Sequence, residues 1–377
     1  MRSRQGRLDA IIVPASRPAC FIQPVIELAA YLGVLMVILC SKQTKVEQVA
    51  RRVARTPGAR SLIVPIPYGW KHPKFPTRTS AADFKDANAC RESDLSAKRN
   101  LGLLLARLHG WNKVAFVDDD VLDTDNIALL ASQLERHQVA GMRVGPHPDN
   151  SVVCHARRLA GFAQEVFVTG AVLGVHCNDR PLSFFPDIYN EDWFFFAKQA
   201  AARELPCVGN AKQAEYDPFV AQDRARHEEF GDLLAEGLYA LFGEEDPRVP
   251  FYEQLDAATR TYWSRFIEAR HEVITETKTR LHRFIQPNAD NGGVSSALKS
   301  LAAAEDQLDT ITPDLCVNFL DAWRDDLEDW QKFSNGVNNV GGTREAMDFL
   351  ELKTWTHAEF GAVVVDSKTA TARFKVL

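Results

Sequence analysis

The sequence has no uninterrupted apolar run of the length that crosses a bilayer. Its most apolar stretch, residues 24–40, contains Glu27 and Gly33 and is too short and broken for a membrane span. The basic residues 1–7 precede a strand-like segment interrupted by Pro14 and Arg17, which is not the pattern of a signal peptide. We expect no integral membrane span.

The sequence also lacks paired cysteines. It has seven cysteines, an odd number, with no Cys-x-x-Cys spacing among them. This pattern favours reduced thiols in a cytoplasmic protein over a disulfide framework or a zinc site.

No long basic run offsets the formal net charge of -6. This balance argues against a nonspecific nucleic-acid binder, although a site for a small phosphate-bearing ligand needs only local positive charge. No fixed-period repeat is present, which argues against a solenoid. The 377 residues, 46% hydrophobic and 25% charged, suit a globular enzyme with a sizeable core.

Strand-like and helix-like segments alternate at the start of the chain. Short apolar runs at residues 10–13, 34–40 and 61–65 predict strands, and residues 21–32 and 44–55 between them predict helices. Such alternation implies a parallel sheet with right-handed crossovers, the beginning of a nucleotide-binding α/β layout.

The most informative stretch is residues 113–121, where a predicted buried strand stops on Asp118, Asp119 and Asp120. Adjacent carboxylates repel one another, so a fold accommodates them best beside a cation or strong donors. Oxygen ligands of this kind suit Mg²⁺ or Mn²⁺, with water and substrate phosphates completing the coordination. The alternative is that Asp123 and its neighbours cap the next predicted helix, residues 125–138.

The predicted helix that begins at Ser93 or Asp94 carries Lys98, Arg99 and Asn100 in its first turns. Cations near a helix amino terminus oppose the helix dipole, so a nearby anion would explain them. The alternative is that they are solvated surface charges.

Prolines and Gly69 in residues 67–91 predict an irregular loop, and a loop of this length is uncommon unless it is functional or disordered. We interpret it as a lid over a substrate, with a surface excursion as the alternative. Its aromatic and cationic side chains are Trp70, Lys71, His72, Lys74 and Arg78.

Two later features complete the pattern. Residues 165–175 predict a strand interrupted by Gly170 and Gly174, where the backbone approaches a ligand closely or bulges. Glu191 and Asp192 lie at an apparent helix start, where a carboxylate acts as a base or as a cap.

The character of the chain changes after Pro250. We predict one long helix at residues 251–285, helices at 295–308 and 315–333, and a terminal hairpin from 360–366 and 371–376. The expected domains are residues 1–245 and a mainly helical extension, residues 246–377, through which the chain could form a homo-oligomer.

In order and spacing, four motifs resemble the GT-A glycosyltransferases, especially family 2. They are residues 14–18, the Lys-Arg-Asn-x-Gly segment ending at Gly102, the aspartate triplet, and Asn-Glu-Asp-Trp ending at Trp193. The resemblance covers about residues 8–230. It implies an α/β fold of the GT-A type, Rossmann-like, with a mostly parallel central sheet flanked by helices.

The resemblance also implies roles for individual residues. Asp118 and Asp120 match the outer positions of the Asp-x-Asp motif, which contacts the donor ribose and the divalent ion, with Asp120 the first choice for the metal and Asp119 the spacer. Asp192 matches the base that deprotonates the acceptor hydroxyl in inverting members, with Glu191 beside it. The remaining residues expected around the donor nucleotide-diphosphate sugar are Pro14, Ala15, Ser16, Arg17, Lys98, Arg99 and Asn100.

The chain departs from the family at two places. No acidic residue follows the second predicted strand, which ends before Lys42, so the donor base is open. His227 stands where processive synthases have tryptophan, which argues against a processive membrane enzyme. Some retaining members use a histidine as an extra metal ligand, and His227 is a candidate for that role.

The sequence thus predicts a metal-dependent hexosyltransferase, inverting with Asp192 as base, whose acceptor is unknown. The alternatives are a retaining enzyme acting on a small soluble acceptor, a sugar-phosphate nucleotidylyltransferase, and a noncatalytic scaffold. Residues 14–18 contain no glycine, which argues against the nucleotidylyltransferase.

Overall fold

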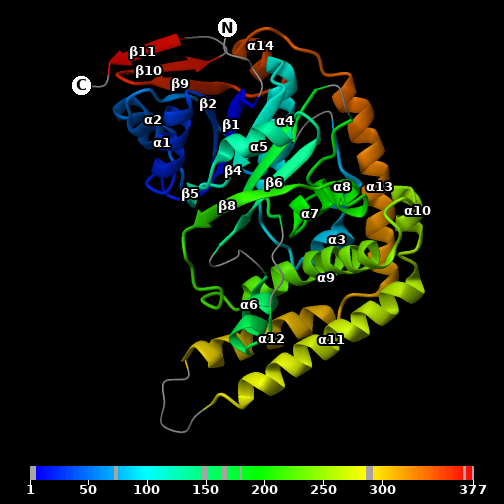
Figure 1. Cartoon of the computed structure of the whole chain (residues 1–377). Helices are drawn as coiled ribbons and strands as arrows, with labels where there is room; N and C mark the ends of the chain where they lie inside the picture. Colours follow the sequence, from blue (N-terminus) through cyan, green and yellow to red (C-terminus); the bar gives the residue numbers. More distant parts are fainter. Residues whose placement is uncertain are drawn as a thin grey trace.

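The chain folds as an α/β protein with a large mixed sheet flanked by helices (Figure 1). The computed structural model describes residues 6–71, 75–145, 151–163, 168–178, 181–285, 292–367 and 371–375. The strand order is β11-β10-β9-β3-β2-β1-β4-β7-β6-β8-β5.

Four parallel strands form the centre of the sheet. They are β1 (Ala10–Ala15), β2 (Leu35–Cys40), β3 (Arg60–Pro65) and β4 (Lys113–Val117). The first crossovers run through α1 (Gln23–Leu32), which ends at Gly33 in the left-handed conformation, and α2 (Val46–Arg55). These elements confirm the α/β alternation predicted for the start of the chain.

The core lies on both faces of this sheet. In β1, Ala10 and Ile12 belong to one apolar cluster, whereas Ile11 and Val13 belong to a second cluster on the other face. A strand buried on both faces has no polar alternation, which is why it appears in the sequence as a continuous apolar run.

The rest of the sheet is mostly antiparallel and includes one parallel pair, so it is not parallel as predicted. β7 (Val172–His176) is antiparallel to both β4 and β6 (Val139–Val144), and β5 (Val121–Thr124) is antiparallel to β8 (Cys207–Gln213). The prediction of a mostly parallel sheet is therefore wrong. Apolar patterning shows which residues a strand buries, but strand direction depends on where the connections carry the chain.

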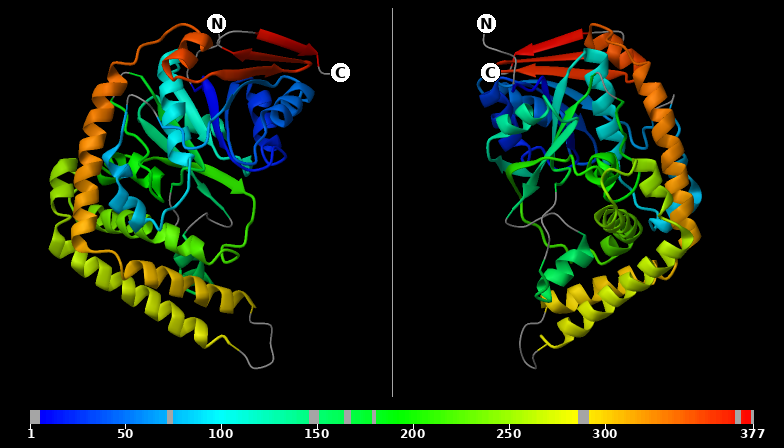
Figure 2. Two further views of the ribbon diagram at one scale, coloured as in Figure 1. Left: turned by 180° about the vertical axis from the view of Figure 1, so that it is seen from behind. Right: turned by 45° about the vertical axis from the view of Figure 1, so that its right-hand side comes forward.

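The C-terminal strands extend the same sheet. The predicted hairpin exists as β10 (Ala362–Ser367) and β11 (Thr371–Lys375), and the unpredicted β9 (Thr354–Glu359) pairs antiparallel with β3. Figure 2 shows these strands at the same end of the molecule as the amino terminus, and β9 and β10 pack against α2. The end of the chain thus returns to the sheet of the first region. The division after residue 245 stays a prediction.

The helix α4 (Leu95–His109) packs on one face of the sheet, opposite to the face covered by α1 and α2. A Cβ at Gly102 would lie 2.8 Å from the Phe116 ring and 2.9 Å from Ile12, so the absence of a side chain lets α4 pack directly on β1 and β4. This close packing places Lys98 and Arg99 against the ends of those strands.

Seven further helices in the described part of the chain lie between strands, and all of them except α9 are short. They are α3 (Ala82–Ala87), α5 (Ile127–Gln133), α6 (Val152–Leu159), α7 (Glu191–Phe195), α8 (Ala197–Ala201), α9 (Asp223–Glu244) and α14 (Thr343–Phe349).

The mainly helical C-terminal region lies along one side of the sheet (Figure 2). The single helix predicted for residues 251–285 is divided into α10 (Phe251–Asp256) and α11 (Arg260–His282), because Thr259 caps a new helix by accepting the Tyr262 N–H. The next two predicted helices are confirmed as α12 (Gly292–Leu308) and α13 (Pro313–Asn335).

Residues 67–91 are only partly irregular, because α3 and a short 3₁₀ turn, Arg78–Ser80, form within them. The buried carboxylate of Asp326 on α13 accepts the backbone N–H groups of Arg78 and Thr79, at 2.8 and 2.9 Å. His72 and Lys74 lie outside the described residues, as do residues 165–167 of a predicted strand and the predicted turn at 146–150. The 3₁₀ turn of the proposed lid is anchored to α13.

Among the described helices, none is both long enough and apolar enough to cross a membrane.

Candidate functional site

The carboxyl ends of β1 and β4 define the place where a ligand would bind. β1 pairs with β2 on one side and β4 on the other, so the chain order reverses at this strand. Ligands in open α/β sheets gather in the crevice at such a switch point. Ser16 and Arg17 follow β1 there, and the three aspartates follow β4.

The middle aspartate is a structural anchor. The Asp119 carboxylate is almost fully buried and accepts the backbone N–H of Ser16 at 2.7 Å and that of Arg17 at 2.8 Å. Asp119 therefore fixes the loop after β1 and is more than the spacer that the motif suggested.

The outer aspartates have different partners. Asp118 accepts from Arg99 Nη2 at 2.9 Å, whereas Asp120 accepts from Gln213 Nε2 at 2.9 Å and pairs with Arg17 Nη2 at 2.8 Å. The Arg17 guanidinium also pairs with Asp119. The triplet thus draws side chains from three parts of the sequence.

Arg99 joins the two acidic motifs. Besides its bond to Asp118, it donates through Nη1 to Glu191 Oε1 at 2.6 Å and through Nη2 to the Gly170 carbonyl at 3.0 Å. The residue is 2% exposed. A cation this buried needs its acidic partners, which explains why an arginine occupies the first turns of a helix despite the dipole.

Lys98 supports the loop after β1. Its ammonium donates to the Ala15 carbonyl at 2.8 Å and to Ser16 Oγ at 2.7 Å, and it pairs with Asp94 at 3.1 Å. Burial lowers the pKa of Lys98, while Asp94 opposes that shift. Pro14 and Ala15 themselves are buried residues of β1, and partly exposed side chains begin at Ser16.

Asn100 holds the segment before α7. Its side-chain amide donates to the Phe185 carbonyl and accepts the Phe185 N–H, both at 2.8 Å. Asn100 therefore acts on the position of Glu191 and Asp192 through the backbone.

Asp192 lies beside Gly170 and Arg99. Its carboxylate accepts the backbone N–H groups of Gly170 and Trp193. A Cβ at Gly170 would lie 2.6 Å from Arg99 Nη1 and 2.9 Å from the Asp192 Cβ, so only glycine fits. Gly170 thus accommodates side chains of this site, and the close approach of its backbone to a ligand stays a prediction.

Two carboxyl groups of the site hold protons more tightly than usual. Burial raises the pKa of Asp118 to about 7 against the lowering effect of Arg99, with further raising by Asp120 and Asp119. Burial and the neighbouring Glu191 raise the pKa of Asp192 to about 6. Both values lie close to neutrality, where a carboxylate exchanges protons readily.

The site has more acidic than basic groups. Asp118, Asp119, Asp120 and Glu191 share ion pairs with two arginines, Arg17 and Arg99. Carboxylate oxygens with such a charge deficit suit a divalent cation that takes its other ligands from water and phosphate.

His227 is not brought into this cluster by any described contact. It lies in the first turns of α9 and is partly buried. Among the described residues, no hydrogen bond or ion pair connects it to the three aspartates.

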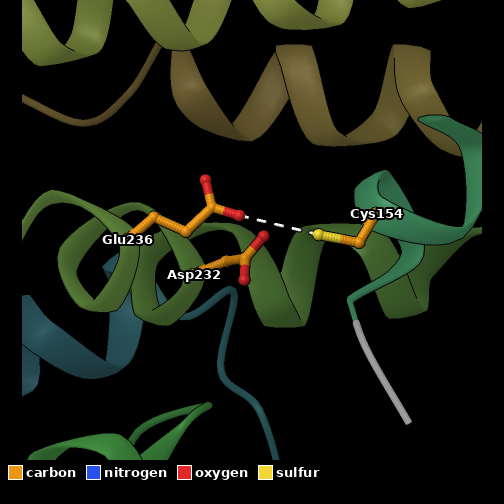
Figure 3. A group of neighbouring side chains, drawn as sticks. All are labelled: Cys154, Asp232 and Glu236. Carbon is orange, nitrogen blue, oxygen red and sulfur yellow. Dashed lines mark hydrogen bonds between the residues drawn. The ribbon is translucent and has the colours of Figure 1, made fainter. Parts of the chain in front are cut away.

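A separate group of possible metal ligands lies between α6 and α9. Figure 3 shows the Cys154 thiol donating to Glu236, with Asp232 beside them. Within the described part of the chain, these are the only three such residues whose ligand atoms all lie within 4.8 Å of one another. Both carboxylates already bind Arg270 of α11 at 2.6 Å, so the group has its own cation.

Sequence reasoning missed several residues that build the site. Gln213 orients Asp120, and Thr44 donates to the Arg17 carbonyl at 2.5 Å. Gln213 ends an unpredicted strand, and no local pattern distinguishes either residue from surface polar residues. Only the pairing of β8 with β5 carries Gln213 to the aspartates.

The fold and the site define an α/β protein in which carboxylates, a buried arginine and a loop held by a lysine lie at the carboxyl ends of central strands. No protein-family model matches the chain, and no curated protein sequence is significantly similar to it.

Proposed function

We propose that this protein is a metal-dependent glycosyltransferase of the GT-A type that transfers a hexose from a nucleotide-diphosphate sugar to an acceptor hydroxyl. The observation that supports this most is the convergence of the separate sequence motifs on Arg99. One guanidinium contacts Asp118 of the triplet and Glu191 of the later motif, 73 residues apart in the chain.

The arrangement suits the donor half of such a reaction. A nucleoside diphosphate leaves as an anion, so charge must be neutralised while the anomeric bond breaks. Asp120, with Asp118, would hold Mg²⁺ or Mn²⁺, which supplies Lewis-acid stabilisation of the leaving diphosphate when bound. Arg17 supplies a cation at the same edge and is 46% exposed.

The other half of the reaction needs a base. Asp192 has a pKa raised to about 6, so it is mostly ionised at neutral pH yet basic enough to accept a proton. Its carboxylate is held by two backbone N–H groups, which orient it without neutralising it. These features favour the inverting reaction with Asp192 as the base.

Calorimetry with UDP, GDP and their sugars, with and without Mn²⁺, tests the proposal. We expect one nucleotide series to bind, and to bind more tightly with Mn²⁺. If none of these compounds binds, the proposed function is wrong.

The variant Asp120→Ala separates catalysis from a scaffold role. We expect loss of the Mn²⁺-dependent gain in nucleotide affinity, about tenfold or more, in a protein whose thermal unfolding is still cooperative. Unchanged biological activity of this variant would instead favour a noncatalytic scaffold.

A further inference from the structure

The place that a divalent cation would take beside Asp120 is occupied by a cation of the protein itself. Arg17 Nη2 lies 2.8 Å from Asp120 Oδ2, and the same guanidinium pairs with Asp119. The Asp119 and Asp120 side chains are only 2% and 4% exposed, whereas their partner Arg17 is 46% exposed.

The backbone of Arg17 is held by contacts that do not depend on its side chain. Its N–H donates to Asp119 at 2.8 Å, and its carbonyl accepts from Thr44 Oγ1 at 2.5 Å. The Arg17 side chain is 46% exposed. Moving the guanidinium away from Asp120 therefore leaves these backbone contacts of the loop in place.

The other cations of the site cannot exchange in this way. Arg99 is 3% exposed and bonded to two acids and a carbonyl, and Lys98 is fully buried between the Ala15 carbonyl and Asp94. Opening either would leave buried charges without partners, which is costly. The Arg17 side chain is 46% exposed and so can be hydrated when it leaves, and the incoming divalent ion would compensate the two buried carboxylates.

We propose that Arg17 is the resident counter-cation of Asp120 and exchanges places with the divalent ion, after which its freed guanidinium binds the donor diphosphate. This proposal rests on the proposed function. Arg17 then opposes metal binding to the empty protein but favours it when a diphosphate is present, so the metal and the nucleotide bind cooperatively. Arginine suits the second role because its planar donors match phosphate oxygens.

The test is Mn²⁺ binding to the full chain, measured by calorimetry, for the wild type, Arg17→Gln and the control Arg51→Gln. Arg51 is exposed on α2 and is not one of the residues of the site. Its variant changes the net charge by the same amount as Arg17→Gln. Without nucleotide, we expect Arg17→Gln to bind Mn²⁺ about fivefold or more tightly than the wild type and the control.

The second measurement repeats the titration with UDP or GDP present. In the wild type the nucleotide should tighten Mn²⁺ binding, and in Arg17→Gln this gain should shrink by about fivefold or more. Arg17→Lys, which keeps the charge but not the planar donors, should lie between the two and provides the test if the glutamine variant does not fold.

The outcomes separate this inference from the proposed function. Equal Mn²⁺ affinity in the wild type and the Arg17 variants, or no Mn²⁺ binding to any of them, overturns the exchange. If Arg17→Gln tightens Mn²⁺ binding but no nucleoside diphosphate binds to any protein, the counter-cation role stands, whereas the diphosphate role and the proposed function both fail.

Discussion

Individual residues in this site are positioned by charges that the fold buries. Arg99 satisfies Asp118, Glu191 and the Gly170 carbonyl at once, and removing it would leave these groups unpaired. The structure also divides the triplet: Asp119 holds the loop after β1, and Asp120 faces the exposed Arg17. Neighbouring aspartates of the triplet therefore have different structural roles.

The first residue-scale prediction concerns Asp192. We expect Asp192→Asn to lower kcat by about 100-fold or more, because an amide cannot take up the proton of the substrate hydroxyl. The affinity for the nucleotide should change little. The steady-state rate and the calorimetric affinity check the two halves. A variant that keeps the wild-type rate would exclude Asp192 as the base.

The pH dependence of the wild type is a second prediction for Asp192. A base must be ionised, and burial raises the pKa of Asp192 to about 6, so kcat/KM should fall as the pH drops through about 6. A profile of kcat/KM from pH 5 to 8 measures this. An acidic limb near pH 4, the range of an ordinary aspartate, would contradict the assignment.

Whole elements carry these residues to one place. The helix α4 lies directly on β1 and β4 because Gly102 has no side chain. Asn100 of α4 then holds Phe185, in the segment that precedes α7. The preceding Tyr189 packs against α9 at Gly231. The position of Asp192 thus depends on packing between α9 and the loop before α7.

A glycine pair in α9 tests this dependence. A Cβ at Gly231 would lie 2.3 Å from the Tyr189 carbonyl oxygen, whereas nothing lies within 4 Å of one at Gly243 in the same helix. We expect Gly231→Ala to destabilise the protein by about 1–3 kcal/mol and to reduce turnover by displacing the loop.

Gly243→Ala is the matched control. It should stabilise the protein by about 0.5–1 kcal/mol, because alanine is the better helix former, and should leave turnover unchanged. Denaturant unfolding and steady-state kinetics measure both variants. Equal behaviour of the two variants would show that Tyr189 does not restrain the site.

At the scale of the whole molecule, the C-terminal helices are tied to the site by a buried ion network. Arg270 of α11 binds Glu229, Asp232 and Glu236 of α9, and Asp232 in turn accepts from Asn190, next to Glu191. The C-terminal region therefore contributes to the placement of the acidic motif at the start of α7.

Arg270→Met should destabilise the protein by about 3–5 kcal/mol, since it leaves buried carboxylates without their cation. The matched control is Arg226→Met, which breaks an exposed pair between α9 and Asp306 of α12 and should cost about 1 kcal/mol or less. Denaturant unfolding compares them, and equal losses would show that the Arg270 network is not what fastens α11.

The amino-acid pattern was enough to predict the first α/β elements, the helical C-terminal region and the two acidic motifs. Continuous apolar runs predict buried strands, and an unusual cation in the first turns of α4 predicts a nearby anion, because both are local consequences of burial and the helix dipole. His227 and the lid interpretation came from the family resemblance and from composition, and no described contact connects either to the aspartates.

The amino-acid pattern did not predict strand direction, the pairing of β9 with β3, the break before α11 or the partners of each aspartate. These depend on pairings between distant segments, such as β8 with β5, which brings Gln213 to Asp120. A local pattern contains no information about which distant backbone supplies the partner. The three aspartates are plain in the sequence, but the division of their roles follows from where Arg17, Arg99 and Gln213 arrive in space.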